Sequence, residues 1–185
     1  MAFLTGGLNF SNSATFLILI VLAGNLGATK TEIGFMVSIA ALGGIVGSLL
    51  GGQIQKRFTF GQVIIAMGWL SAIFYSLFLF APNFLVLGII SALTWMIAPI
   101  YNVVQFSYRL ALIPERLQGR VNSTFRLLAF GFQPLGSAVA GVLLAAVGTT
   151  NTLLFYLATQ VLLAITTTIN SHVRNAQPLA SVQSE

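Results

Sequence analysis

The sequence predicts an all-α membrane protein with six transmembrane helices arranged as a 3+3 inverted-repeat bundle. Three observations lead to this prediction: an apolar composition, the spacing of the apolar runs, and a one-sided distribution of Lys and Arg. Of 185 residues, 57% are hydrophobic and 6% are charged, and the mean hydropathy is +0.94. A soluble domain carries about a quarter charged residues because its surface faces water. The chain therefore belongs in a lipid bilayer.

Apolar runs long enough to cross a bilayer recur along the chain. A membrane helix needs about 20 mostly apolar residues, and the breaks between runs fall at charged, Pro, Gly or Asn positions. The six predicted helices cover residues 3–23, 33–52, 61–80, 84–106, 125–147 and 152–169. The longest predicted loop is 109–120. Together the helices form a predicted bundle over residues 1–174, and we expect the polar tail, 175–185, to be disordered and cytoplasmic.

The basic residues fall almost entirely on one side of this predicted membrane. Lys and Arg close to helix ends are retained in the cytoplasm during insertion. With six spans, all Lys and Arg residues except Lys30 lie on one side, together with both termini. We therefore expect both termini in the cytoplasm.

Small residues recur at every fourth position in the second and fifth predicted helices. Gly43, Gly47 and Gly51 align on one face of the second, and Ser137 and Gly141 do so in the fifth. Such faces let a neighbouring backbone approach closely. Because these are the middle helices of two consecutive triplets, and three is odd, the triplets have opposite orientations. That is the inverted repeat on which many transporters are built.

The residue types also limit the function. The absence of Cys excludes disulfides and thiolate metal ligands. The predicted spans contain no Asp, Glu or His, so they offer neither a general base for hydrolysis nor a metal site. No carbonyl loop or acidic ring indicates a channel. The net charge of +5 fits cytoplasmic loops. We expect no enzyme activity, no cofactor and no nucleic acid, and we expect the lipid bilayer and a small-molecule substrate as partners.

Polar and aromatic side chains share faces of the first and fourth predicted helices, at spacings of three, four and seven residues. These cavity candidates are Asn9, Asn12, Trp95, Tyr101, Asn102 and Gln105. One interpretation is a cavity that offers aromatic stacking and amide hydrogen bonds to an amphiphilic molecule. The other is hydrogen bonding between helices, with aromatic anchors at the membrane interface. The spacing favours neither.

Two loops and the helix that follows the second of them complete the pattern. A basic loop follows the second predicted helix, and Pro114-Glu115-Arg116-x-x-Gly119-Arg120 leads into Gly131-x-x-Pro134-x-Gly136. In order and spacing these elements resemble the carboxy-terminal half of a major facilitator superfamily transporter, over residues 25–174. Within that superfamily they most resemble the bacterial drug and siderophore exporters that include macrolide efflux proteins.

The resemblance implies half of a major facilitator fold, acting in secondary-active efflux of hydrophobic or amphiphilic molecules across a bacterial inner (plasma) membrane. The first and fourth helices would line the cavity, and the second and fifth would face the other half. It implies cytoplasmic gate residues, namely Gln55, Lys56, Arg57, Glu115, Arg116 and Arg120. The helix-interface residues would be Gly43, Gly47, Gly51, Pro134, Gly136 and Gly141.

The chain departs from the family pattern in two ways. Gln55 stands where the family's loop motif has an acidic residue, so it supplies no charge for Arg116 or Arg120. A complete member has two six-helix halves, and we expect this chain to be a fragment or a separately encoded half. Its partner would be an amino-terminal half or a second copy. The alternative function is a non-transporting six-helix membrane protein that packs on partners through the Gly43-Gly47-Gly51 face.

Overall fold

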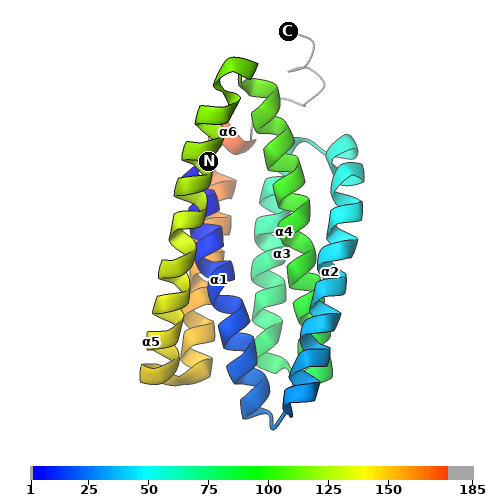
Figure 1. The fold of residues 1–185 in the computed structure, drawn as a ribbon, viewed down its shortest axis with the longest axis vertical. Coiled ribbons are helices and arrows are strands. Elements are labelled where there is room, and N and C mark those ends of the chain that lie inside the picture. Colours follow the sequence, from blue (N-terminus) through cyan, green and yellow to red (C-terminus); the bar gives the residue numbers. More distant parts are fainter. Residues whose placement is uncertain (1, 175–185) are drawn as a thin grey trace.

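The computed structural model describes residues 2–174, and throughout that range the regular secondary structure is helical. Short connections join the helices into an elongated bundle (Figure 1). The helices are α1 (Ala2–Asn25), α2 (Lys30–Arg57), α3 (Phe60–Leu77) with the 3₁₀ turn η1 (Phe78–Phe80), α4 (Phe84–Leu112), α5 (Glu115–Ile169) and α6 (Ser171–Arg174). The predicted tail, 175–185, lies outside the described residues.

Within the described range, five helices are long and apolar enough to cross a membrane: α1 to α5. The predicted count of six is not confirmed, because the last two predicted spans both fall within α5. This helix is interrupted at Gly148, whose φ of 78° and ψ of 176° are not helical. Glycine adopts a positive φ without the steric conflict of a Cβ.

The two arms of α5, residues 115–147 and 149–169, fold back on each other. The Tyr156 hydroxyl donates a hydrogen bond to the carbonyl oxygen of Gly136 at 2.6 Å, although 20 residues separate them. In a straight helix such residues would lie about 30 Å apart. The arms therefore run side by side, as the yellow and orange segments of Figure 1 show.

Local sequence explains where α2, α3 and α4 begin. Thr29 and Thr59 each form a capping box, with Glu32 and Gln62 as the third helical residues, and the Asn83 side chain caps α4. These side chains satisfy backbone N–H groups that have no partner in the first turn.

The connection between α4 and α5 is much shorter than the predicted loop of residues 109–120. Only Ile113 and Pro114 lie outside the helices. Pro114 disfavours helical geometry at the preceding residue, and Ile113 is extended, with φ of −108° and ψ of 124°. The polar residues after Pro114 therefore continue α5 beyond its apolar part instead of forming a loop.

Helices α2 and α4 form one close pair, and α1 and α5 form another, with α3 contacting both α4 and α5. A Cβ at Gly43 would overlap the carbonyl oxygen of Ala92, and one at Gly47 would overlap that of Met96. Gly51 packs on the Val103 side chain. The expectation that this face meets another half or a partner is therefore corrected: α4 of the same chain covers it.

The fifth-helix candidates divide in the same way. Gly136 is buried, and its Cβ would overlap the carbonyl oxygen of Phe10 in α1. A Cβ at Gly141 would meet nothing within 4 Å, and Pro134 is exposed. Of these three candidates, Gly136 forms an interface within the bundle.

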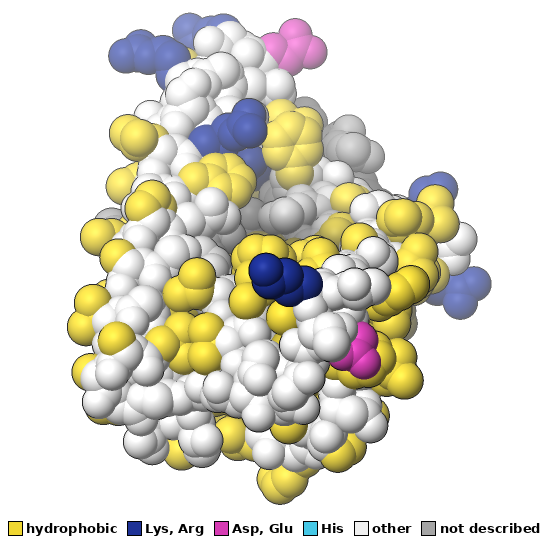
Figure 2. Space-filling view, turned by 60° about the horizontal axis from the view of Figure 1, so that its bottom comes forward, with side chains coloured by type: hydrophobic (Ala, Val, Ile, Leu, Met, Phe, Trp, Pro, Cys, Tyr) yellow, Lys and Arg dark blue, Asp and Glu magenta, His cyan; other side chains and the backbone are white. Residues whose placement is uncertain are grey.

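The outside of the bundle is apolar along its length. Leu49 of α2 is 71% exposed and Leu127 of α5 is 75% exposed, which fits side chains that face lipid. In Figure 2 the end that carries the turn between α1 and α2 faces the viewer, and most Lys and Arg side chains lie farther from the viewer. Charge is thus concentrated toward the opposite end.

Candidate functional site

Three adjoining hollows run along the face that α1 and α4 share. The first, of about 330 Å³, lies beside Trp95, and the third, of about 440 Å³, lies beside Arg109. A small hollow of about 40 Å³ lies between them and shares Asn12 and Ala98 with the first and Asn102 with the third. All six cavity candidates line at least one hollow; they are Asn9, Asn12, Trp95, Tyr101, Asn102 and Gln105.

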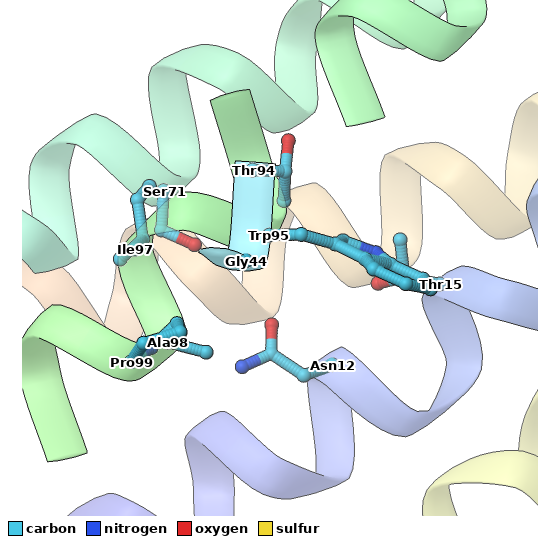
Figure 3. Close-up of a pocket in the computed structure, with 9 residues that line it drawn as sticks. All are labelled: Asn12, Thr15, Gly44, Ser71, Thr94, Trp95, Ile97, Ala98 and Pro99. Carbon is cyan, nitrogen blue, oxygen red and sulfur yellow. The ribbon is translucent and has the colours of Figure 1, made fainter. Parts of the chain in front are cut away.

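The first hollow combines an aromatic surface with hydrogen-bonding groups. Figure 3 shows the Trp95 indole lying between α4 and Thr15 of α1, with the Asn12 amide directed into the space beneath it. Ile97, Ala98 and Pro99 supply apolar walls from α4. An amphiphilic molecule could stack its apolar part on the indole and form a hydrogen bond with the amide, which is the usual chemistry of small-molecule pockets.

The second hollow borders a hydrogen-bonded cluster that ties α1 to α4. Gln105 Nε2 donates to Thr5 Oγ1 and, at 3.2 Å, to Tyr101 Oη. The Thr5 and Tyr101 hydroxyls lie 3.1 Å apart. All three residues are buried, with Gln105 only 5% exposed. For Tyr101 and Gln105 this geometry favours hydrogen bonding between helices over contact with a substrate.

Asn9 of α1 also both lines hollows and forms a hydrogen bond to a neighbouring helix, in this case α5. It lines the second and third hollows, and its Nδ2 donates to the carbonyl oxygen of Ala129 at 2.8 Å. One turn further along α1, Ser13 Oγ donates to the carbonyl oxygen of Gln133 at 2.8 Å. These bonds fix the register of α1 on α5. Among the cavity candidates, Asn12, Trp95 and Asn102 keep their polar or aromatic groups available to the hollows.

The third hollow is built where the end of α4 meets the start of α5. Arg109 Nη2 donates to Asn122 Oδ1 at 2.7 Å, and the guanidinium lies 3.8 Å from the centroid of the Phe125 ring. Arg126 lines the same hollow. Sequence reasoning missed Asn122 and Phe125 because they stand at the edge of a predicted loop. Asn122 lies one helical turn before Arg126, and this spacing is the signal that could have included it.

One comparison with known proteins identifies the family. A family model described as Major Facilitator Superfamily matches residues 1–181. The chain belongs to the Major Facilitator Superfamily. Members of this superfamily are membrane transporters, which agrees with the apolar helices and with the expectation that the chain is not an enzyme. A comparison with curated proteins gave no match.

The superfamily gate candidates lie in two groups. Gln55 Oε1 accepts a hydrogen bond from Ser107 Oγ at 3.2 Å, which ties the end of α2 to α4. Lys56 and Arg57 complete α2 and are exposed. The others, Glu115, Arg116 and Arg120, are exposed in the first turns of α5. Gln55 therefore acts as a helix-to-helix contact without the charge of the superfamily's acidic residue.

Proposed function

We propose that the chain is a six-helix half of an exporter, which moves hydrophobic or amphiphilic small molecules out of the cell by secondary-active alternating access. The observation that carries this proposal is the row of hollows along α1 and α4, with Trp95, Asn12 and Asn102 directed into it. Transporters of this construction bind substrate near the bilayer midplane, at the boundary between repeats. Trp95 lies near the middle of α4, as that position requires.

The break at Gly148 supports six crossings. If each arm of α5 crosses the membrane, α1 to α3 form one triplet, and α4 with the two arms forms the other. Corresponding helices then run in opposite directions, as in a 3+3 inverted repeat. The start of α1 and the short α6 lie toward the end where α4 passes into α5 (Figure 1). Most Lys and Arg residues lie toward the same end, which supports cytoplasmic termini. The bacterial inner membrane and the drug and macrolide exporter branch are proposed from the resemblance of the loops.

A second six-helix unit is part of the proposal. The hollows are lined on α1 and α4 by polar groups that would otherwise face lipid, which is unfavourable in the membrane. Either an amino-terminal half or a second copy of this chain would enclose them. The alternative, a non-transporting interaction protein, relied on the Gly43-Gly47-Gly51 face. Since α4 covers that face, the alternative loses the surface on which it was based.

Dye transport tests the proposal. The full chain, alone or with a candidate amino-terminal half, is reconstituted into liposomes, and uptake of rhodamine 6G is followed under an imposed pH gradient. We expect uptake only where crosslinking captures two six-helix units. We expect Trp95→Ala to lower the initial rate severalfold, whereas the lipid-facing control Leu49→Ala leaves it unchanged.

Two results would contradict the proposal. Robust uptake by liposomes that hold only uncrosslinkable monomers would refute the requirement for a second unit. An absence of gradient-dependent uptake in every paired preparation would refute transport itself.

A further inference from the structure

The third hollow carries positive charge without a compensating carboxylate. Arg109 and Arg126 both line it, beside the amides of Asn102 and Asn122. In the described part of the chain the acidic residues are Glu32 and Glu115, and neither lines this hollow. Glu32 starts α2, and Glu115 is exposed in the first turn of α5. The hollow is therefore electrostatically suited to an anion.

Arg109 is held in place with one donor unused. Nη2 is bonded to Asn122, and the guanidinium lies over the rings of Phe125 and Phe106, at 3.8 and 5.5 Å from their centroids. Nη1 is buried and has no hydrogen-bond acceptor among the described residues. A buried donor without an acceptor is unfavourable, and more so when it is charged. An acceptor from outside the chain would remove this penalty. Because Nη1 is buried, such an acceptor reaches it when the side chains around the guanidinium move.

The remaining walls of the hollow are apolar. Phe106, Phe125 and Phe130 line it together with Val103 and Ala129. A volume of about 440 Å³ falls in the range of pockets that enclose small organic ligands. The hollow thus offers a cationic point surrounded by aromatic surface, which suits a molecule that joins an anionic group to an aromatic body.

We propose that this hollow binds the carboxylate of an amphiphilic aromatic anion, with Arg109 Nη1 as the donor and Arg126 as the second cation. The proposal rests on the proposed function and deepens it, since it adds aromatic carboxylates to the classes of molecule that are exported. A guanidinium matches a carboxylate in shape and forms charge-assisted hydrogen bonds with it. The phosphate of an anionic lipid offers similar chemistry, so the test separates the two.

Binding to the full chain in nanodiscs of zwitterionic phosphatidylcholine tests this site. The probes are 1-pyrenebutanoate and its neutral amide, and fluorescence titration, corrected with empty nanodiscs, gives both affinities. We expect the carboxylate to bind about tenfold more tightly or better, because its hydrogen bond to a guanidinium is charge-assisted, whereas that of the amide carries no anionic charge. Arg109→Gln and Arg126→Gln should each reduce this preference severalfold or more. The control Arg174→Gln, at an exposed residue of α6, should retain it.

Each outcome of the binding experiment either supports or overturns the proposed anion site. Arg126 is exposed, so Arg126→Gln remains informative if Arg109→Gln fails to fold. A preference that survives both substitutions, or that Arg174→Gln removes equally, would overturn the proposal. So would loss of the Arg109-dependent binding when phosphatidylglycerol is included in the nanodisc, because a lipid would then occupy the site. If the neutral amide probe binds as tightly as the carboxylate, and Trp95→Ala weakens its binding, this inference is refuted while the proposed function stands. If neither probe binds, the result also counts against the proposed function.

Discussion

The two close helix pairs of the bundle are joined by different means. In the α2/α4 pair, Gly43 and Gly47 bring the helices into backbone contact over an apolar surface. In the α1/α5 pair, Gly136 does the same, but polar side chains of α1 also bond carbonyl oxygens of α5. Both pairs border the hollows. Close packing is therefore common to both interfaces. Of these two pairs, α1/α5 adds bonds from side chains to backbone carbonyls along the helices, whereas α2/α4 has the bond from Ser107 to Gln55 at its end.

The difference follows from what each helix can offer. The face of α2 toward α4 is built largely of glycine, so van der Waals contact holds most of that interface, and the hydrogen bond from Ser107 to Gln55 lies at its end. Helix α1 carries Asn9 and Ser13, whose polar groups need partners inside a membrane. They find them on α5, at Ala129 and Gln133. Three predictions follow from this contrast, from the largest expected effect to the smallest.

Gly43→Ala should destabilise the bundle by about 1–3 kcal/mol, because its Cβ would displace the backbone of α4. Gly44→Ala is the matched control, since a Cβ there meets nothing within 4 Å. Alanine at that position should be neutral or stabilising by up to about 1 kcal/mol. Loss of helical circular dichroism on titration with sodium dodecyl sulfate measures both. Equal effects would show that the α2/α4 contact is not the close one described.

Gln105→Ala should lower stability by about 1.5 kcal/mol, because it removes the amide that links Thr5 to Tyr101 inside the bundle. Its effect on which dyes are transported should be small. Asn102→Ala, whose side chain is exposed to the hollows, should show the reverse. Membrane abundance and dye uptake are measured together for both variants. If Gln105→Ala changes dye selectivity at unchanged abundance, Gln105 contacts substrate.

Ser13→Ala should have the smallest effect, a loss of about 0.6 kcal/mol, which is typical of hydrogen bonds between membrane helices. Its hydroxyl bonds Gln133 of α5. The control Ser48→Ala removes a hydroxyl that bonds only Gly44 of its own helix, so it should leave stability unchanged. The same detergent titration applies. A larger loss at Ser48 would reverse the contrast between the two pairs.

Sequence periodicity predicts which residues share a face of a helix, but it does not predict which helix packs against that face. Four-residue spacing predicts close backbone approach, and Gly43 and Gly47 lie against the backbone of α4, a partner that the spacing could not name. The polar candidates of α1 and α4 line the hollows, yet only the folded structure separates Gln105, which is bonded inward, from Asn102, which is exposed. Residue spacing determines the direction of side chains around one helix axis, whereas the pairing of helices depends on the packing of the whole bundle.

The ends of helices are harder to predict from sequence, because charged residues occur both in loops and in helical turns that extend beyond the bilayer. Residues 115–120 are polar but helical, since a helix can continue past the apolar part of a bilayer. The predicted loop of residues 109–120 hid Asn122 and Phe125 from the candidate site. At Gly148 the predicted helices leave residues 148–151 for a turn. In the structure one glycine with a positive φ makes the break, and residue 149 already belongs to the next helical arm.

The absence of Cys permits a direct test of the central claim that the face of α1 and α4 lines a substrate pathway. A single cysteine is introduced at Asn102 or, as a control, at the lipid-facing Leu49, and labelling by a water-soluble maleimide is measured in reconstituted liposomes. The account predicts rapid labelling at position 102 that an amphiphilic dye slows, and almost none at position 49. Labelling at position 49 with none at position 102 would contradict it.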